Sequence, residues 1–181
     1  MKSEDISRRS FLKRAAALSA AAAIPSFWIP SKANAMPGVP FVSANEKVRI
    51  AFIGIGNRGG EIAQELYKTG LCEVVALCDV DMGAPHTQKL ISMFPKVPRF
   101  QDFRQMFDKM ADKIDAVTVG VPDHAHFPIT IEAMAHGKHV YVEKPMARTF
   151  QEIEVMMRAE KKFGVVTQMG NQGHSEANYF Q

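Results

Sequence analysis

Cysteine is scarce in this sequence, with two among 181 residues. Cys72 and Cys78 are too few for a metal cluster built from paired CxxC motifs. If both lie in one strand, they point to the same face with Cα atoms roughly 20 Å apart, far beyond disulfide reach. We therefore expect two unbridged thiols, and we predict no metal site.

An excess of basic charge is missing from most of the chain. The formal net charge is +3, but residues 1–35 hold six of the 22 basic and two of the 19 acidic residues. Residues 36–181 therefore carry 16 basic and 17 acidic residues, a net charge of −1. A domain without a basic stripe lacks the electrostatic footprint of a nucleic-acid binder, so we expect no nucleic-acid partner.

The sequence also has no apolar run strong enough for a stable transmembrane helix. Ala15–Ile29 is rich in alanine, but it is interrupted and shorter than the ~20 apolar residues that a span needs. It follows the twin-arginine pattern Ser-Arg-Arg-Ser-Phe-Leu-Lys at residues 7–13 and precedes Ala-Asn-Ala at residues 33–35. Small residues at this place suit signal peptidase, so cleavage is expected before Met36.

We therefore predict a twin-arginine signal peptide over residues 1–35 and a linker containing Pro37, Gly38 and Pro40 over residues 36–46. The twin-arginine export machinery is then a partner, and the periplasm is the expected location. An uncleaved signal that anchors the protein in the membrane is the alternative.

From Val48 onward, short apolar runs alternate with longer segments of helical spacing, which is typical of a parallel α/β sheet. The expected strands are Val48–Ile53, Val74–Cys78, Ile114–Val119, His139–Val142 and Val165–Met169. The expected helices are Gly60–Lys68, Pro85–Met93, Phe103–Lys109, Phe127–Ala135 and Phe150–Phe163. We predict a doubly wound parallel sheet of the Rossmann type, with its ligand site at the carboxyl ends of the strands.

A glycine-rich turn follows the first expected strand. Gly54, Gly56 and Gly59 form a G-x-G-x-x-G motif between a strand and a helix, with Asn57 and Arg58 inside it. The first glycine permits a tight turn, the second lets a diphosphate approach the backbone, and the third lets the helix pack on the strand. Amides at the start of the helix then face the diphosphate, so these five residues are predicted to bind a dinucleotide.

Asp79 lies twenty residues beyond Gly59, at the end of the next expected strand. An acid at this place can accept hydrogen bonds from both ribose hydroxyls of the adenosine half, and it repels a 2′-phosphate, so we predict NAD, with NADP possible. Arg58 leaves the choice open because it can meet either the diphosphate or a 2′-phosphate. A helix cap in the Asp79-Val80-Asp81 turn is the alternative for the acid.

Two further segments follow expected strands. In residues 121–126, Pro122 fixes the backbone, while Asp123 and His126 either contact the nicotinamide half of the cofactor or cap the helix. Glu143 and Lys144 precede Pro145 directly after a buried strand. The Lys144 ammonium there can hydrogen-bond a substrate hydroxyl and stabilise alkoxide character during hydride transfer. Glu143 can hold this lysine or bind the nicotinamide ribose, and a surface ion pair is the alternative.

The glycine motif, residues 121–126 and residues 137–145 (Gly-Lys-His-Val-Tyr-Val-Glu-Lys-Pro) together resemble the glucose–fructose oxidoreductase, inositol dehydrogenase and rhizopine-catabolism (Gfo/Idh/MocA) family. The resemblance covers essentially all of residues 47–175. It implies a Rossmann domain for NAD(P) over residues 47–170, and a C-terminal α/β open-sheet domain that begins within residues 171–181 and is largely absent here.

The same resemblance implies roles for particular residues. Lys144 is the catalytic lysine that contacts substrate, and Glu143 is a neighbour of the cofactor. Residues Pro122, Asp123 and His126 lie near the nicotinamide. Asn171 is a further cofactor contact.

The resemblance implies hydride transfer between NAD(P) and a sugar or cyclitol hydroxyl as the activity of the intact enzyme, which is usually a homo-oligomer. One alternative is an NAD-dependent glycosidase that oxidises its sugar transiently. Another is a nucleotide- or sugar-binding module without catalysis. We expect the present chain to be a fragment that binds cofactor without turnover.

Overall fold

The computed structural model describes residues 47–175 of the chain. The predicted signal peptide over residues 1–35 and the linker over residues 36–46 lie outside the described residues, as do residues 176–181. Expectations about those segments stay predictions. Within residues 47–175, no helix has both the length and the apolar character needed to cross a membrane.

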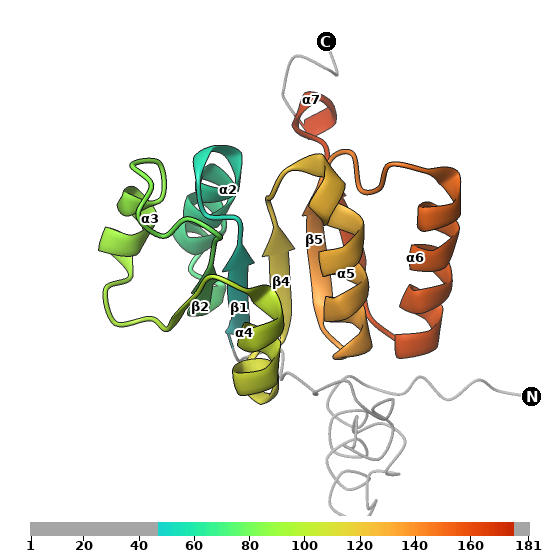
Figure 1. Ribbon diagram of the computed structural model, residues 1–181, viewed down its shortest axis with the longest axis horizontal. Coiled ribbons are helices and arrows are strands. Elements are labelled where there is room, and N and C mark those ends of the chain that lie inside the picture. The colour runs from blue at the N-terminus through green and yellow to red at the C-terminus, as the bar shows by residue number, and fades with distance from the viewer. Residues whose placement is uncertain (1–46, 176–181) are drawn as a thin grey trace, which may run out of the picture. The chain divides into compact units, whose positions relative to one another are not determined.

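The described chain forms a six-stranded parallel sheet in the order β3-β2-β1-β4-β5-β6 (Figure 1). Its strands are β1 (Val48–Ile53), β2 (Cys72–Cys78), β3 (Arg99–Phe100), β4 (Ala116–Val119), β5 (His139–Glu143) and β6 (Thr167–Gly170). This strand order is that of the dinucleotide-binding Rossmann fold. The predicted doubly wound parallel sheet is therefore confirmed.

Helices cover both faces of the sheet (Figure 1). The chain contains α2 (Asn57–Lys68), α3 (Gln88–Met93), α4 (Phe103–Met110), α5 (His126–Ala135), α6 (Phe150–Phe163) and α7 (Gln172–Ser175), with short 3-10 turns η3 (Ala111–Lys113) and η4 (Asp123–Ala125). Alternate residues of β1 point into two separate cores. Ile50 and Phe52 pack with residues of α2 and α3, whereas Ala51 and Ile53 pack with residues of α4, α5 and α6.

The two cysteines occupy different cores, which corrects the expectation that they share one face. Cys72 packs in the core beneath α2 and α3, and Cys78 packs in the core beneath α4, α5 and α6. The cause is an irregularity in β2: Ile50 pairs with Val74 but Ala51 pairs with Ala76, so one residue of β2 is skipped. An extra residue reverses the alternation of side chains beyond it. Both thiols are unbridged, as expected.

Strand β3 is not predicted by the sequence. It consists of Arg99 and Phe100, which pair with Leu77 and Cys78 at the end of β2. Two residues are too few to show an alternating pattern, so only the contact with β2 defines this strand.

The amino-terminal ends of β1 and β4 are held together by an ion pair. Asp115, 2% exposed, accepts hydrogen bonds from Nε, Nη2 and the backbone N–H of Arg49 at 3.0, 2.6 and 2.9 Å. Burial alone raises the pKa of Asp115, but the hydrogen bonds from Arg49 outweigh it and hold that pKa below its usual value. This structural pair lies at the end of the sheet opposite to the predicted site.

Candidate functional site

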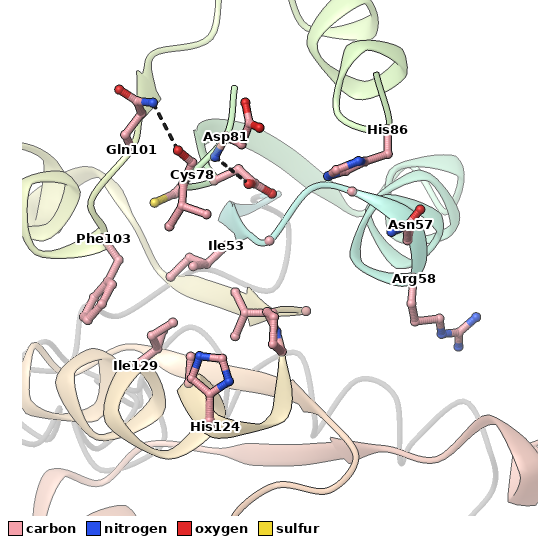
Figure 2. Close-up of a pocket in the computed structure, with 18 residues that line it drawn as sticks. Ile53, Asn57, Arg58, Cys78, Asp81, His86, Gln101, Phe103, His124 and Ile129 are labelled. Carbon is pink, nitrogen blue, oxygen red and sulfur yellow. Dashed lines mark hydrogen bonds between the residues drawn. The ribbon is translucent and has the colours of Figure 1, made fainter. Parts of the chain in front are cut away.

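A cleft of about 650 Å³ opens at the carboxyl ends of β1, β2 and β4 (Figure 2). Its volume is in the range of small-molecule and cofactor sites. Six of the predicted cofactor residues line it: Gly54, Gly56, Asn57, Arg58, Asp79 and Pro122. Apolar side chains line it too: Ile53 from β1, Cys78 from β2, Phe103 from α4 and Ile129 from α5. The cleft therefore offers polar groups beside an apolar wall, as an adenosine needs.

The glycine turn packs more closely than any other residue type allows. Gly54 has φ of 79°, and a Cβ there would lie 2.5 Å from the carbonyl oxygen of Gly120. A Cβ on Gly59 would collide with the carbonyl oxygen of Gly54 and lie 2.9 Å from that of Gly120. Gly120, directly after β4, is part of this contact and was not among the predicted residues. Its place at the end of a neighbouring strand was the available signal.

The start of α2 presents unpaired amides to the cleft. Asn57, the first residue of α2, has φ of 43°, and no side chain caps the helix at Gly56. The first turn contains no acidic residue. Backbone N–H groups in the first turn of a helix have no intrahelical partner, and the helix dipole favours an anion there. The turn is therefore suited to hold a diphosphate.

Asp79 ties the glycine turn to the end of β2. Its Oδ2 accepts from the backbone N–H of Ile55 at 2.9 Å, and its Oδ1 accepts from that of Asp81 at 3.0 Å. A carboxylate has about four acceptor sites, so capacity remains for ribose hydroxyls at the cleft wall. The alternative of a helix cap is wrong, because the next helix begins at Gln88 and the contact with Asp81 closes a local turn.

A smaller pocket of about 280 Å³ lies at the ends of β4 and β5. Five predicted residues from three separate segments line it: Arg58, Asp123, His126, Glu143 and Lys144. Gln172 of α7, which the sequence did not single out, lines it as well. The peptide bond between Lys144 and Pro145 is cis. The structure thus gathers the residues expected around the nicotinamide and the substrate.

Glu143 faces Arg58 rather than Lys144. Its side chain is 6% exposed, and Oε1 lies 3.6 Å from Arg58 Nε without a hydrogen bond to any described residue. Arg58 Nη1 is 3.1 Å from Glu61. The expected alternative of a Glu143–Lys144 ion pair is therefore wrong. Burial and the nearby Glu143 carboxylate also raise the pKa of Tyr141.

The Arg58 side chain points away from Asp81 and Cys78 (Figure 2). Its two acidic partners are Glu61, one turn further along α2, and Glu143, which lines the smaller pocket. Arg58 lines the same cleft as Asp79, but in this structure its guanidinium is paired with Glu61 and Glu143 and not with Asp79.

His126 positions the loops of the smaller pocket. Its ring is 1% exposed, with Nδ1 2.6 Å from the carbonyl oxygen of Pro145 and Nε2 2.8 Å from that of Val121. Both ring nitrogens are thus engaged by main chain, and neither is offered to a metal or a nicotinamide. No side chain caps η4 or α5, so the capping alternative for Asp123 and His126 is wrong too.

Asn171 lies directly after β6 and before α7, at the same carboxyl edge of the sheet. It is half-buried, and its backbone oxygen accepts from the N–H of His174 at 3.1 Å. It does not line either of the two pockets described above. Its predicted contact with the cofactor stays a prediction.

Residues 48–171 match the family described as an oxidoreductase family with an NAD-binding Rossmann fold. The chain belongs to the Gfo/Idh/MocA family. Two curated relatives are glycosyl hydrolase family 109 protein 1 of Shewanella sp. (strain ANA-3) and α-N-acetylgalactosaminidase of Shewanella oneidensis. Each is 30% identical over 164 residues, which cover 82% of this chain and 35% of the relative. The chain thus spans about a third of the length of these relatives.

Solved structures of similar fold include a dehydrogenase from Chromobacterium violaceum, with a TM-score of 0.68 and 25% identity over 75% of this chain and 39% of that one. GenD2 from gentamicin A biosynthesis, solved with NAD, has a TM-score of 0.63 and 26% identity over 73% of this chain and 37% of that one. Membership of this NAD-binding family and the close packing of the glycine turn together support NAD as the cofactor of this domain.

Proposed function

We propose that the intact protein transfers hydride between NAD and a hydroxyl group of a sugar or cyclitol. The observation that carries this proposal is the meeting of Lys144 and Glu143 with Arg58 of the glycine turn around one pocket. The lysine is exposed there, beside the cleft that holds the predicted dinucleotide residues. The Lys144 ammonium supports the proposal, because at this edge of the sheet it can hydrogen-bond a substrate hydroxyl.

NAD, when bound, supplies the hydride acceptor. The glycine turn and the first amides of α2 hold the diphosphate, and Asp79 accepts from the ribose of the adenosine half. Lys144 donates a hydrogen bond to the substrate hydroxyl and stabilises negative charge on its oxygen as the C–H bond breaks. The hydroxyl proton passes to a base that we place in the second domain of the intact protein.

The test is a sugar and cyclitol panel with the intact protein, following the absorbance of the reduced cofactor. Lys144→Ala should lower kcat about 10²- to 10³-fold and leave NAD affinity within about threefold, because the ammonium acts on the substrate. Lys161→Ala, which removes an exposed lysine of α6, is the matched control. Unchanged kcat in Lys144→Ala would contradict the assigned role.

A second candidate is glycosidic bond cleavage through transient sugar oxidation, favoured by the glycosyl hydrolase relatives. It predicts release of the chromophore from an aryl N-acetylgalactosaminide without net formation of reduced cofactor. The dehydrogenase predicts the converse, with reduced cofactor formed in proportion to oxidised sugar. The same protein sample therefore separates the two reactions.

We also propose that the protein is exported by the twin-arginine route and assembles as a homo-oligomer. The proposal is supported by the two adjacent arginines, Arg8 and Arg9, and by the apolar segment after them. Replacing both arginines with lysine should retain the protein in the cytoplasm on cell fractionation. Periplasmic accumulation of that variant would contradict the export proposal, and sedimentation of the intact protein reports the oligomeric state.

A further inference from the structure

His86 reaches from the loop between β2 and α3 to the glycine turn (Figure 2). A Cβ built on Gly56 would collide with Cδ2 of His86 and lie 2.9 Å from its Nε2. The imidazole thus packs directly on the bare Cα of the second glycine. Because 30 residues separate His86 from Gly56, no local sequence pattern predicts this contact.

The loop that carries His86 is built independently of the ring. Thr87 is fully buried, and its Oγ1 donates to the carbonyl oxygen of Ala84 at 2.8 Å. Asp81 Oδ1 accepts from the backbone N–H of Gly83 at 3.0 Å. Among the residues that the structure describes, the His86 ring neither donates nor accepts a hydrogen bond. Rotation about the side-chain torsions of His86 can therefore move the ring while the loop backbone stays in place.

The second glycine of this motif is bare so that a diphosphate can approach the backbone. In this structure the imidazole lies in the direction that a Cβ on Gly56 would take. The His86 imidazole and a bound diphosphate therefore cannot occupy the space beside Gly56 at the same time. We propose that His86 is a gate over the diphosphate position, which a dinucleotide displaces when it binds. The inference rests on the dinucleotide site and adds to it a residue that sets nucleotide affinity.

A closed gate lowers the apparent affinity by the fraction of molecules that are open. If about one molecule in ten is open, removal of the ring strengthens binding about tenfold, and if about one in three is open, about threefold. The effect should depend on the diphosphate. NAD and ADP must displace the ring, whereas adenosine does not reach the position that the ring covers.

The experiment is calorimetric titration of the intact protein with NAD, ADP and adenosine. His86→Ala should bind NAD and ADP about three- to tenfold more tightly than wild type, with adenosine affinity unchanged. Lys89→Ala, an exposed change on the following helix, is the matched control and should equal wild type. Both variants alter exposed residues, so both should fold.

Equal or weaker ADP binding by His86→Ala would overturn the gate, and weaker binding would make His86 a direct ligand contact. Equal strengthening for adenosine would also overturn it. If neither protein binds NAD or ADP, the dinucleotide site itself fails and the gate with it. A second measurement is the NMR signal of the His86 ring in wild type, which should shift on addition of ADP and stay in place with adenosine.

Discussion

Replacing Gly59 with alanine tests the close packing that forms the glycine turn. In a helix interior this change normally stabilises a protein by up to about 1 kcal/mol, because alanine is the better helix former. Here the new Cβ would collide with the carbonyl oxygen of Gly54 and lie 2.9 Å from that of Gly120. The two effects have opposite signs, so the measured sign decides between them.

The steric effect should prevail. Overpacking costs about 1–3 kcal/mol, and the upper end applies because both obstacles are backbone atoms that no side-chain rotation can remove. Subtracting the helix-propensity gain leaves a net loss of about 2 kcal/mol in the free energy of unfolding. Helix α2 must also move away from β1 and β4, which misplaces the amides that hold the diphosphate and should weaken NAD binding about tenfold or more.

Urea unfolding followed by circular dichroism measures the stability change, and calorimetry measures NAD affinity. Gly83→Ala is the control, because a Cβ on this exposed residue meets only Oδ1 of Asp81, at 3.4 Å. Its free energy of unfolding should stay within about 0.5 kcal/mol of wild type. Higher stability in Gly59→Ala together with unchanged NAD affinity would refute the packing argument.

The remaining predictions concern stability and thiol reactivity. Asp115→Ala should lower the free energy of unfolding by about 2–3 kcal/mol, below the full cost of breaking a buried pair because Arg49 is partly exposed; an unchanged urea midpoint would contradict this. The folded-state pKa of Asp115 is lowered, so its contribution is complete well above pH 4 and is lost as the pH falls through the folded value. Burial lowers the pKa of His139, whose Nδ1 accepts a hydrogen bond from a backbone N–H. The free energy of unfolding should therefore fall as the pH drops below about 6.5. In urea unfolding measured at several pH values, His139→Gln should reduce this pH dependence. Burial raises the pKa of Cys78 to about 12 and also raises that of Cys72. A thiol reagent at pH 8 should therefore label both cysteines slowly in the native protein and quickly after unfolding. Fast labelling of the native protein would contradict the burial of these thiols.

The strands and helices that the sequence predicts are those with a strong local pattern. β1 matches its predicted bounds, Val48–Ile53, and α6 matches Phe150–Phe163. Helix α6 has clear local signals, since Thr149 and Glu152 form a capping box and Gly164 ends it with φ of 64°. Other elements are correct in type but shifted at their ends, because pairing with neighbours sets where a strand begins.

Long-range contacts explain what the sequence did not predict. The skipped residue in β2 appears only in the pairing with β1, and it places Cys72 and Cys78 in different cores. The carbonyl partners of His126 and the approach of Arg58 to Glu143 join residues far apart in the chain.

The site residues found from sequence are those with a fixed local spacing. The glycines, Asp79 and Lys144 follow strand ends, and parallel strands bring such positions to one edge of the sheet. Gly120 and His86 act through contacts with this turn that no spacing rule contains. The glycine motif can therefore be predicted from the local sequence, whereas the residues packed against it are identified only from the three-dimensional structure.

The central claim is that the carboxyl edge of the sheet binds NAD through the glycine turn and Asp79. Its most direct test is calorimetric titration of the protein with NAD and NADP, in wild type, in Asp79→Ala and in the control Asp108→Ala, an exposed change on α4. We predict saturable NAD binding, weaker NADP binding, and a loss of NAD affinity of about tenfold or more in Asp79→Ala alone. A folded protein that binds neither nucleotide, or an Asp79→Ala variant that binds NAD as wild type does, would contradict the claim.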